Sequence, residues 1–328
     1  MVHVRRSAIL WPVLATLVLP ATVMAAPPRH AMAANNHDQR TVTAFPMADG
    51  AVPFGVTAGP GGEYVSLNTA VGRFDNHDNL KTYPIPSADP LAGWLTTDPQ
   101  GGIWISERNS GNMGRLSPNG SIVEYPLPAG PDALPQGSVI SPWGSVYVAE
   151  QGANAIARLD PWTGHVTEFP VPTADATPLG LALGLDGALY FTERSADKVG
   201  RMTPNGTFRE WSLDPGSFPN RIVSGPDGAI WFTELFGGKL GRISMGGTLT
   251  EYPIDGGPVG ITVGNDHQIY VDLDLAKQVA RVNLHGVVTA TWDLPGAVAP
   301  LQVAPGRGQD LWVTDASANT VFRLSVVH

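Results

Sequence analysis

The sequence contains no cysteine, so disulfides and thiol chemistry are excluded. Charged residues make up only 15% of the 328 residues, and 29 acidic side chains outnumber 20 basic ones, for a formal net charge of −9. A nucleic-acid partner is not expected, because phosphate binding needs a basic face. Hydrophobic residues reach 43% despite 38 glycines and 30 prolines. This composition excludes a disordered chain and suits many short strands joined by tight turns.

Several motifs of catalysis and cofactor binding are also missing. The chain has no Gly-x-Ser-x-Gly nucleophile motif, no phosphate-binding loop and no zinc-ligand spacing. Its repeated segments show no helical period of apolar residues. The sequence therefore predicts an all-β protein without a nucleotide or a zinc ion.

One apolar stretch lies near the N-terminus. Arg5 and Arg6 precede an apolar run over residues 8–19, and small residues follow at Ala25 and Ala26. This pattern predicts a signal peptide over residues 1–26, a flexible leader over 27–40, and a secreted or periplasmic protein. An uncleaved anchor is the alternative, although the run is short for a span that needs about 20 residues. After cleavage no membrane span is expected.

Two columns of residues recur through the rest of the chain. The aromatic column is Tyr64, Trp104, Tyr147, Tyr190, Trp231, Tyr270 and Trp312, with spacings of 40, 43, 43, 41, 39 and 42 residues. The arginine column is Arg73, Arg115, Arg158, Arg201, Arg242, Arg281 and Arg323. The arginine follows its aromatic residue by 11 positions in six units and by 9 in the first. Seven units of about forty residues indicate a closed repeat architecture.

Each unit divides into four short strand-like pieces, here called A to D from the centre outward. In residues 218–256 they are "RIVS", "AIWFTE", "KLGRIS" and "TLTEYPI", with the turn "GPDG" after the first. Four antiparallel strands repeated seven times predict a seven-bladed β-propeller over residues 41–328. The seventh unit lacks strand D, and residues 41–46, "TVTAFP", match it. We expect this segment to pair with residues 321–326 and close the ring, which gives a monomer without exposed sheet edges.

Acidic residues gather at the end of strand B. That position reads Leu67, Glu107, Glu150, Glu193, Glu234, Leu273 and Asp315. The propeller topology places the B–C and D–A loops on one side, the loop face, so these residues predict a ring of carboxylates around one mouth of the central channel. Such a ring suits Mg²⁺ or Ca²⁺, and the metal candidates are Glu193, Glu234, Asp272 and Asp274. The alternative is structural, because each acidic residue lies eight positions before its arginine and can pair with it.

The same face is expected to carry a ligand site. Phe54, Phe218, Asn220 and Phe236 fall in its loops or at the start of strand A, and they are the candidate ligand-binding residues. Four histidines, His77, His165, His267 and His285, fall in turns of the opposite face. No catalytic residue is assigned, because none of these histidines is placed to act as a base beside the carboxylates.

The units GPDGAIWFTELFGGKLGRIS and GLDGALYFTERSADKVGRMTPNG resemble the repeats of the virginiamycin B lyase family. The resemblance covers residues 41–328 and implies a seven-bladed propeller that opens a cyclic peptide antibiotic at its ester by elimination. It also implies magnesium, acidic ligands and a histidine in a Pro-His-Gly slot before strand A. In this sequence that slot reads Phe54, Ala92, Gln136, Leu179, Asn220, Val259 and, in the seventh unit, Pro300 or Leu301.

Two functions follow from these patterns. The first is an exported binding platform that presents its loop face to a peptide, a cell-envelope polymer or a protein. The second is a magnesium-dependent carbon–oxygen lyase acting on a streptogramin B-like depsipeptide. The sequence favours the binding platform, because the histidine of the family pattern is absent from the slot.

Overall fold

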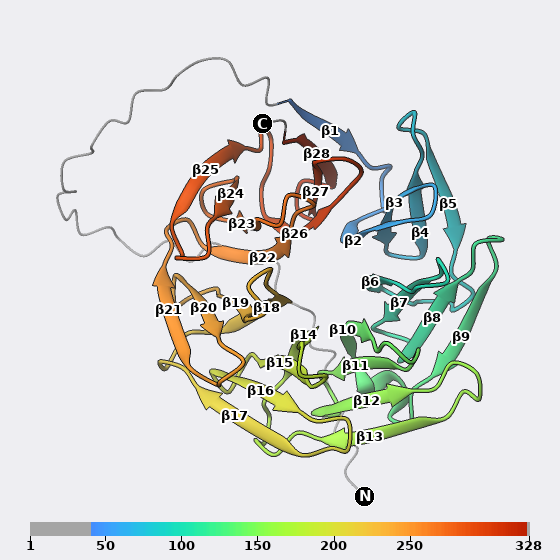
Figure 1. Cartoon of the computed structure of the whole chain (residues 1–328). Helices are drawn as coiled ribbons and strands as arrows, with labels where there is room; N and C mark the ends of the chain where they lie inside the picture. The colour runs from blue at the N-terminus through green and yellow to red at the C-terminus, as the bar shows by residue number, and fades with distance from the viewer. Residues whose placement is uncertain (1–40, 327–328) are drawn as a thin grey trace, which may run out of the picture. The chain divides into compact units, whose positions relative to one another are not determined.

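The structure is a computed structural model that describes residues 41–326. The described chain forms seven four-stranded antiparallel sheets, arranged as blades around a central axis (Figure 1). The predicted seven-bladed propeller is therefore confirmed. The predicted signal peptide and leader, residues 1–40, lie outside the described residues.

Each blade begins at the axis with strand A and ends at the rim with strand D. The A strands are β2 (Pro53–Gly59), β6 (Ala92–Thr97), β10 (Pro135–Ile140), β14 (Pro178–Leu183), β18 (Pro219–Ser224), β22 (Pro258–Val263) and β26 (Pro300–Pro305). The B strands are β3 (Gly62–Leu67), β7 (Ile103–Glu107), β11 (Val146–Glu150), β15 (Leu189–Glu193), β19 (Ile230–Glu234), β23 (Ile269–Leu273) and β27 (Asp310–Asp315). The C strands are β4 (Ala70–Phe74), β8 (Asn112–Leu116), β12 (Ala155–Leu159), β16 (Lys198–Met202), β20 (Lys239–Ile243), β24 (Gln278–Val282) and β28 (Thr320–Ser325). The D strands are β5 (Leu80–Pro84), β9 (Ile122–Pro126), β13 (Val166–Pro170), β17 (Phe208–Ser212), β21 (Leu249–Pro253), β25 (Val288–Asp293) and β1 (Val42–Pro46).

The ring closes through the strand nearest the N-terminus. β1 pairs antiparallel with β28, with Thr43 opposite Arg323, and the sheet order is β1-β28-β27-β26. This confirms the predicted closure. The Phe45 ring adds side-chain contacts, since its centroid lies 5.4 Å from that of Trp312 and 5.0 Å from that of Phe74.

The core lies between neighbouring blades. Each hydrophobic cluster combines residues of adjacent sheets, as where Trp231 of one blade packs with Ile269 and Val271 of the next. All seven members of the aromatic column are at most 5% exposed. Burial of such a side chain stabilises the fold by roughly 2–3 kcal/mol. The aromatic column is therefore core packing, as its recurrence predicts.

The arginine column pairs with a residue that the sequence did not suggest. Arg115 contacts Asp98 of the A–B turn at 2.7 Å, and Asp98 also accepts the indole N–H of Trp104. Arg201 and Asp186 repeat the ion pair, as do Arg242 and Asp227. The predicted pairing of these arginines with the carboxylates that end strand B is therefore wrong. In these three blades, aspartates of the A–B turn hold the arginines at the opposite end of the blade.

A column of hydroxyl groups joins neighbouring blades near the loop face. Ser66, Ser106, Thr192, Thr233 and Thr314, one position before the end of strand B, each donate to a backbone carbonyl of the next blade's strand A. Several of these hydroxyls also accept an N–H from their own strand A, as Thr192 does from Gly180 at 2.9 Å. The equivalent residues in the remaining blades are Ala149 and Asp272.

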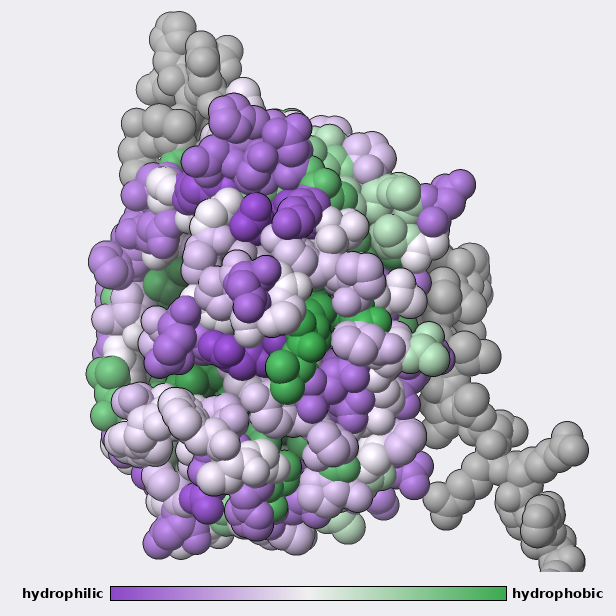
Figure 2. All heavy atoms as spheres, turned by 90° about the vertical axis from the view of Figure 1, so that its right-hand side faces the viewer, coloured by the Kyte–Doolittle hydropathy of each residue, from purple (hydrophilic) through white to green (hydrophobic). Residues whose placement is uncertain are grey.

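The rim of the propeller is mainly polar. Figure 2 shows the side at the right of Figure 1, where hydrophilic residues predominate and hydrophobic ones form small, separate areas. Exposed apolar residues such as Leu80 and Val123 are scattered over the D strands. None of the helical structure in residues 41–326 has the length and apolar character that a membrane crossing would need.

Candidate functional site

The glutamates that end strand B are buried inside the blades. Glu107, Glu150, Glu193 and Glu234 are all 0% exposed. Each lies on the same side of its sheet as a glutamate of strand D, in the pairs Glu107–Glu124, Glu150–Glu168, Glu193–Glu210 and Glu234–Glu251. Four of the five predicted carboxylates are thus in separate pairs within four blades. The fifth, Asp315, is also 0% exposed and accepts the backbone N–H groups of Val298, Ala299 and Ala318, so the predicted ring does not line an open mouth.

Burial raises the pKa values of these four glutamates. Burial raises the pKa of Glu150 to about 8, and the charge of Glu168 adds to this effect. Burial likewise raises the pKa values of Glu107, Glu193 and Glu234 to about 7. Lys198 and Lys239 oppose this increase in the blades of Glu193 and Glu234. In the blade of Glu150, the equivalent first residue of strand C is Ala155. A carboxyl pair that shares a proton reduces like-charge repulsion in a low-dielectric environment.

The four metal candidates do not form a shared ligand set. Glu193 and Glu234 belong to different blades, Asp272 lies near Arg221, and Asp274 pairs with Lys277 at 3.0 Å. Within the described part of the chain, no group of three or more histidine, aspartate or glutamate side chains has an arrangement that could hold a metal ion. Metal binding stays a prediction, and these residues do not fit a resident Mg²⁺ or Ca²⁺ held by all four.

Titration with magnesium or calcium is therefore expected to give at most weak binding. A buried carboxyl that retains its proton must lose it before it can bind a cation, which weakens affinity. Calorimetry at neutral pH checks this, with the melting temperature as a second readout. The opposite result would be a saturating heat and a higher melting temperature that both disappear in Glu193→Gln and Glu234→Gln.

Two of the predicted ligand-binding residues form an aromatic step on the loop face. The ring centroids of Phe218 and Phe236 lie 4.7 Å apart, and Phe236 is 66% exposed. Asp197 fixes this step, because its carboxylate accepts the backbone N–H groups of Gly216 and Phe218 at 2.8 Å. Phe236 belongs to the B–C loop of the same blade, which presents the pair to solvent.

The other two predicted residues have structural contacts. The Asn220 side chain is 5% exposed and donates to the Val259 carbonyl of the next blade at 3.1 Å. Phe54 is half-buried, and its carbonyl accepts the Thr314 hydroxyl at 2.6 Å. Asn220 therefore helps to join two blades, and Phe54 lies on the loop-face side of the closure between the last blade and the first.

A group of residues at the loop-face mouth of the channel was missed by sequence reasoning. We call Trp94, Arg108, Arg194, Arg221 and Asp272 the mouth cluster. Trp94 and Arg221 occupy the same position in their strands, where Gly55, Gly137, Gly180 and Gly260 lie in four other blades. A Cβ on those glycines would approach the neighbouring blade closely, for example to 3.0 Å from the Asn220 carbonyl at Gly180.

Two of the three exceptions to this glycine pattern meet each other, and the third is Gln302 in the last blade. The guanidinium carbon of Arg221 lies 3.1 Å from the ring centroid of Trp94, although the two residues come from blades separated by two others. Arg221 is 7% exposed, and its Nε and Nη1 atoms have no hydrogen-bond partner. The sequence signal for both residues was a large side chain at a position that is glycine in four other blades. A site that serves one ligand needs residues that differ from blade to blade.

Two more arginines face the same mouth. Arg108 and Arg194 are the first residues after β7 and β15, and their backbone N–H groups are hydrogen-bonded to D–A loop carbonyls of their own blades. The Arg194 guanidinium lies over the Phe218 ring at 4.3 Å. Arg108 lowers the pKa of Arg194 by charge repulsion, after the larger effect of burial. The aromatic step and the mouth cluster are therefore continuous through Arg194.

One carboxylate faces these positive charges. Asp272 is 0% exposed, and burial raises its pKa to about 7 while the charge of Arg221 opposes the rise. Burial also lowers the pKa of Arg221, an effect that Asp272 opposes and that Arg194 and Arg108 reinforce. Three guanidinium groups and one carboxyl group thus lie at one mouth of a chain whose formal net charge is −9. A group of guanidinium side chains attracts anions.

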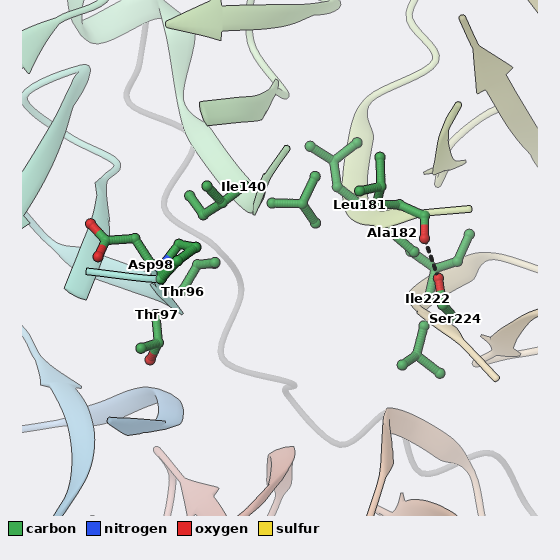
Figure 3. Close-up of a pocket in the computed structure, with 12 residues that line it drawn as sticks. Thr96, Thr97, Asp98, Ile140, Leu181, Ala182, Ile222 and Ser224 are labelled. Carbon is green, nitrogen blue, oxygen red and sulfur yellow. Dashed lines mark hydrogen bonds between the residues drawn. The ribbon is translucent and has the colours of Figure 1, made fainter. Parts of the chain in front are cut away.

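The channel also has a hollow at its other end. A cavity of about 560 Å³ lies where strands β6, β10, β14 and β18 end, on the side of the A–B turns. Its walls are mainly apolar or carry hydroxyl groups, as Figure 3 shows for Thr96, Ile140, Leu181 and Ile222, and they also include Asp98, which pairs with Arg115. Ser224 in this wall donates to the Leu183 carbonyl. The cavity offers mainly apolar volume, whereas the guanidinium groups of the mouth cluster lie at the loop-face mouth.

The described histidines lie away from the mouth. His77, His165 and His285 are in C–D turns and His267 is in an A–B turn, as the sequence predicts. The slot that would hold a histidine reads Gly93 in the second blade, because Ala92 pairs with Glu107 in the register that prolines occupy elsewhere. Among residues 41–326, no histidine occupies this slot.

Comparison with known proteins places the fold and repeats in context. The sequence matches the virginiamycin B lyase family over residues 34–162 and 131–328. No curated protein matches the chain. Among solved structures, selenomethionine-substituted virginiamycin B lyase from Staphylococcus aureus superposes with a TM-score of 0.82 at 26% identity, covering 88% of this chain and 100% of that one.

Two further structures are similar over almost their whole lengths. A streptogramin B lyase has a TM-score of 0.82 at 27% identity and covers 87% of this chain and 97% of its own. A catalytically inactive histidine-to-alanine variant of the S. aureus virginiamycin B lyase, with quinupristin, has a TM-score of 0.81 at 25% identity, with coverages of 88% and 100%. The family resemblance inferred from the repeats is confirmed.

Proposed function

Since the chain belongs to the virginiamycin B lyase family, we propose that it is an exported member that binds a peptide, an envelope polymer or a protein on its loop face. The observation that carries this proposal is the convergence of symmetry-breaking residues at one mouth. Trp94, Arg221 and Asp272 replace residues that elsewhere are mainly glycine or hydroxyl-bearing, and the Phe218–Phe236 step lies beside them. An apolar surface with a few convergent polar groups is typical of a ligand site.

The chemistry of the described residues favours binding over elimination. Ester elimination removes a proton from carbon, forms a carbon–carbon double bond and releases a carboxylate, so it needs a base beside the substrate. The glutamates of this face are buried in pairs and hold protons near neutral pH, and the described histidines are in turns of the other face. In the S. aureus relative, the histidine-to-alanine variant is described as catalytically inactive.

The second candidate is the family's lyase reaction with magnesium. Its support is the 27% identity to a streptogramin B lyase across 97% of that chain. The residues available to it on the loop face are Glu193, Glu234, Asp272 and Asp274, which this structure does not bring together as ligands. Because the described histidines lie in turns of the opposite face, the reaction would also require a base other than these histidines.

Incubation with a streptogramin B depsipeptide and magnesium is expected to leave the ring intact. Elimination preserves the mass of the substrate and hydrolysis adds one water, so chromatographic retention and fragmentation must be measured along with mass. Ring opening that is lost in Glu234→Gln would contradict the binding proposal and favour the lyase.

Binding of the same depsipeptide can be measured in parallel by calorimetry. Phe236→Ala is expected to weaken it at least fivefold, because this exposed ring forms the outer half of the aromatic step. Trp162→Ala is the matched control, since Trp162 is 72% exposed in a C–D turn of the opposite face. Equal losses in both variants would contradict a site on the loop face.

A further inference from the structure

We infer that the mouth cluster is an anion site, which selects ligands carrying a carboxylate or phosphate attached to an apolar group. This inference rests on the proposed function and specifies its ligand chemistry. Arg221 forms the base of the site, Arg108 and Arg194 its sides, and Trp94 with the Phe218–Phe236 step its apolar wall.

Arg221 is buried with unsatisfied donors. Only 7% of the residue is exposed, and its Nε and Nη1 atoms have no hydrogen-bond partner. Buried guanidinium groups are normally hydrogen-bonded, because an unsatisfied charged donor is costly. A planar fork of donors fits the two oxygens of a carboxylate or phosphate.

Charges of both signs surround Arg221. Arg108 and Arg194 act on it repulsively, and Asp272 acts on it attractively. Asp274 pairs with Lys277 at 3.0 Å. Glu107 and Glu193 immediately precede Arg108 and Arg194, yet their side chains are buried in the blades beside Glu124 and Glu210. An anion bound to the Nε and Nη1 donors of Arg221 would lie among three guanidinium groups, whose charges favour it.

Arg221 can be reached from the loop face. Three half-buried residues surround the approach to it, namely Trp94, Arg108 and Arg194, so a ligand meets them before the deeply buried Arg221. The Phe236 ring extends this surface outward and is 66% exposed. An anionic group can reach the guanidinium groups while an attached apolar group lies on the aromatic rings.

The test compares N-acetylphenylalanine, phenyl phosphate and N-acetylphenylalanine amide by calorimetry at neutral pH and low salt. We expect both anions to bind at least tenfold more tightly than the neutral amide. The stronger of the two anions identifies whether carboxylate or phosphate is preferred. Equal affinity for acid and amide would overturn the inference while leaving a loop-face site for apolar ligands, so it is distinguishable from failure of the proposed function.

Three variants separate charge from folding. Arg194→Gln, at a half-buried position, should weaken anion binding at least fivefold and leave amide binding unchanged. Asp272→Asn should strengthen anion binding severalfold, because it removes a carboxyl group that competes with the anion for the charge of Arg221. Arg209→Gln on β17 makes the same charge change as Arg194→Gln, but its guanidinium lies over Trp211 on the outer strand. Equal weakening by Arg194→Gln and Arg209→Gln, or no strengthening by Asp272→Asn, would overturn the inference.

Discussion

A chain that begins at residue 48 should aggregate or melt at least about 10 °C below one that begins at residue 38. Removing β1 breaks all five residue pairings with β28 and leaves that strand as an open edge. It also uncovers Trp312, on which the Phe45 ring stacks. The combined loss is on the order of 5 kcal/mol, and each kcal/mol lowers the melting temperature of a large domain by about 2–4 °C.

Light scattering and thermal melts of the two chains measure this effect. Phe45→Ala provides a smaller change in the same strand and is expected to cost about 2 kcal/mol, since the ring is only partly buried. Ala44→Ser is the control, because Ala44 is exposed on the other side of β1. A chain starting at residue 48 that stays monomeric and melts like the longer one would show that β1 does not close the ring.

The fold could be predicted from the sequence because every blade repeats the same pattern of strands and turns. The aromatic column, the "GPDG"-type turns and the missing seventh strand D each predicted a feature that the structure contains, and residues 41–46 were assigned to the last blade correctly. Such patterns depend on strand alternation and turn chemistry, which operate over short distances along the chain.

The site could be predicted only in part, because side-chain direction depends on the strand register. A β-bulge interrupts the pairing of strands A and B in each blade, for example between Pro178 and Leu181, and shifts the expected neighbours by one residue. Glu193 thus lies opposite Pro178, and Phe191 lies opposite Leu181. The predicted carboxylates were located at the correct strand ends, but their burial against strand D glutamates requires the three-dimensional packing.

The mouth cluster has no local sequence motif, and its residues stand out only against the equivalent positions of the other blades. Arg221 follows Asn220, which was singled out, and it is unusual only beside the glycines of four other blades. Its contact with Trp94 joins residues 127 positions apart and arises from closure of the ring. No local pattern contains that information.

The buried carboxyl pairs make stability depend on pH in a defined direction. A glutamate whose pKa is higher in the folded state binds its proton more tightly there. Its contribution to the free energy of unfolding is therefore fully present below the pKa of the unfolded state, near 4.5. That contribution is lost as the pH rises through the folded values, about 7 for Glu107, Glu193 and Glu234 and about 8 for Glu150. Each retained proton corresponds to about 1.4 kcal/mol per pH unit.

Glu150→Gln is therefore expected to stabilise the protein at alkaline pH, by about 2 kcal/mol near pH 9. In this blade the charge of Glu168 disfavours the ionised form of Glu150, and residue 155 is alanine where two other blades have lysine. Glutamine keeps the shape of the side chain, removes the negative charge and can donate to Glu168. Denaturant unfolding at about pH 4 and about pH 9 measures the difference, which should be small at the lower pH because Glu150 is largely protonated in both the folded and the unfolded state there.

Glu193→Gln is the matched control for this prediction. Its partner Glu210 contacts Lys198 at 2.9 Å and accepts the Thr173 hydroxyl, so a positive charge already offsets the pair. The alkaline stabilisation should consequently be smaller in Glu193→Gln than in Glu150→Gln. Equal stability of Glu150→Gln and the unaltered protein near pH 9, or a larger gain in Glu193→Gln, would mean that repulsion between Glu150 and Glu168 does not limit stability.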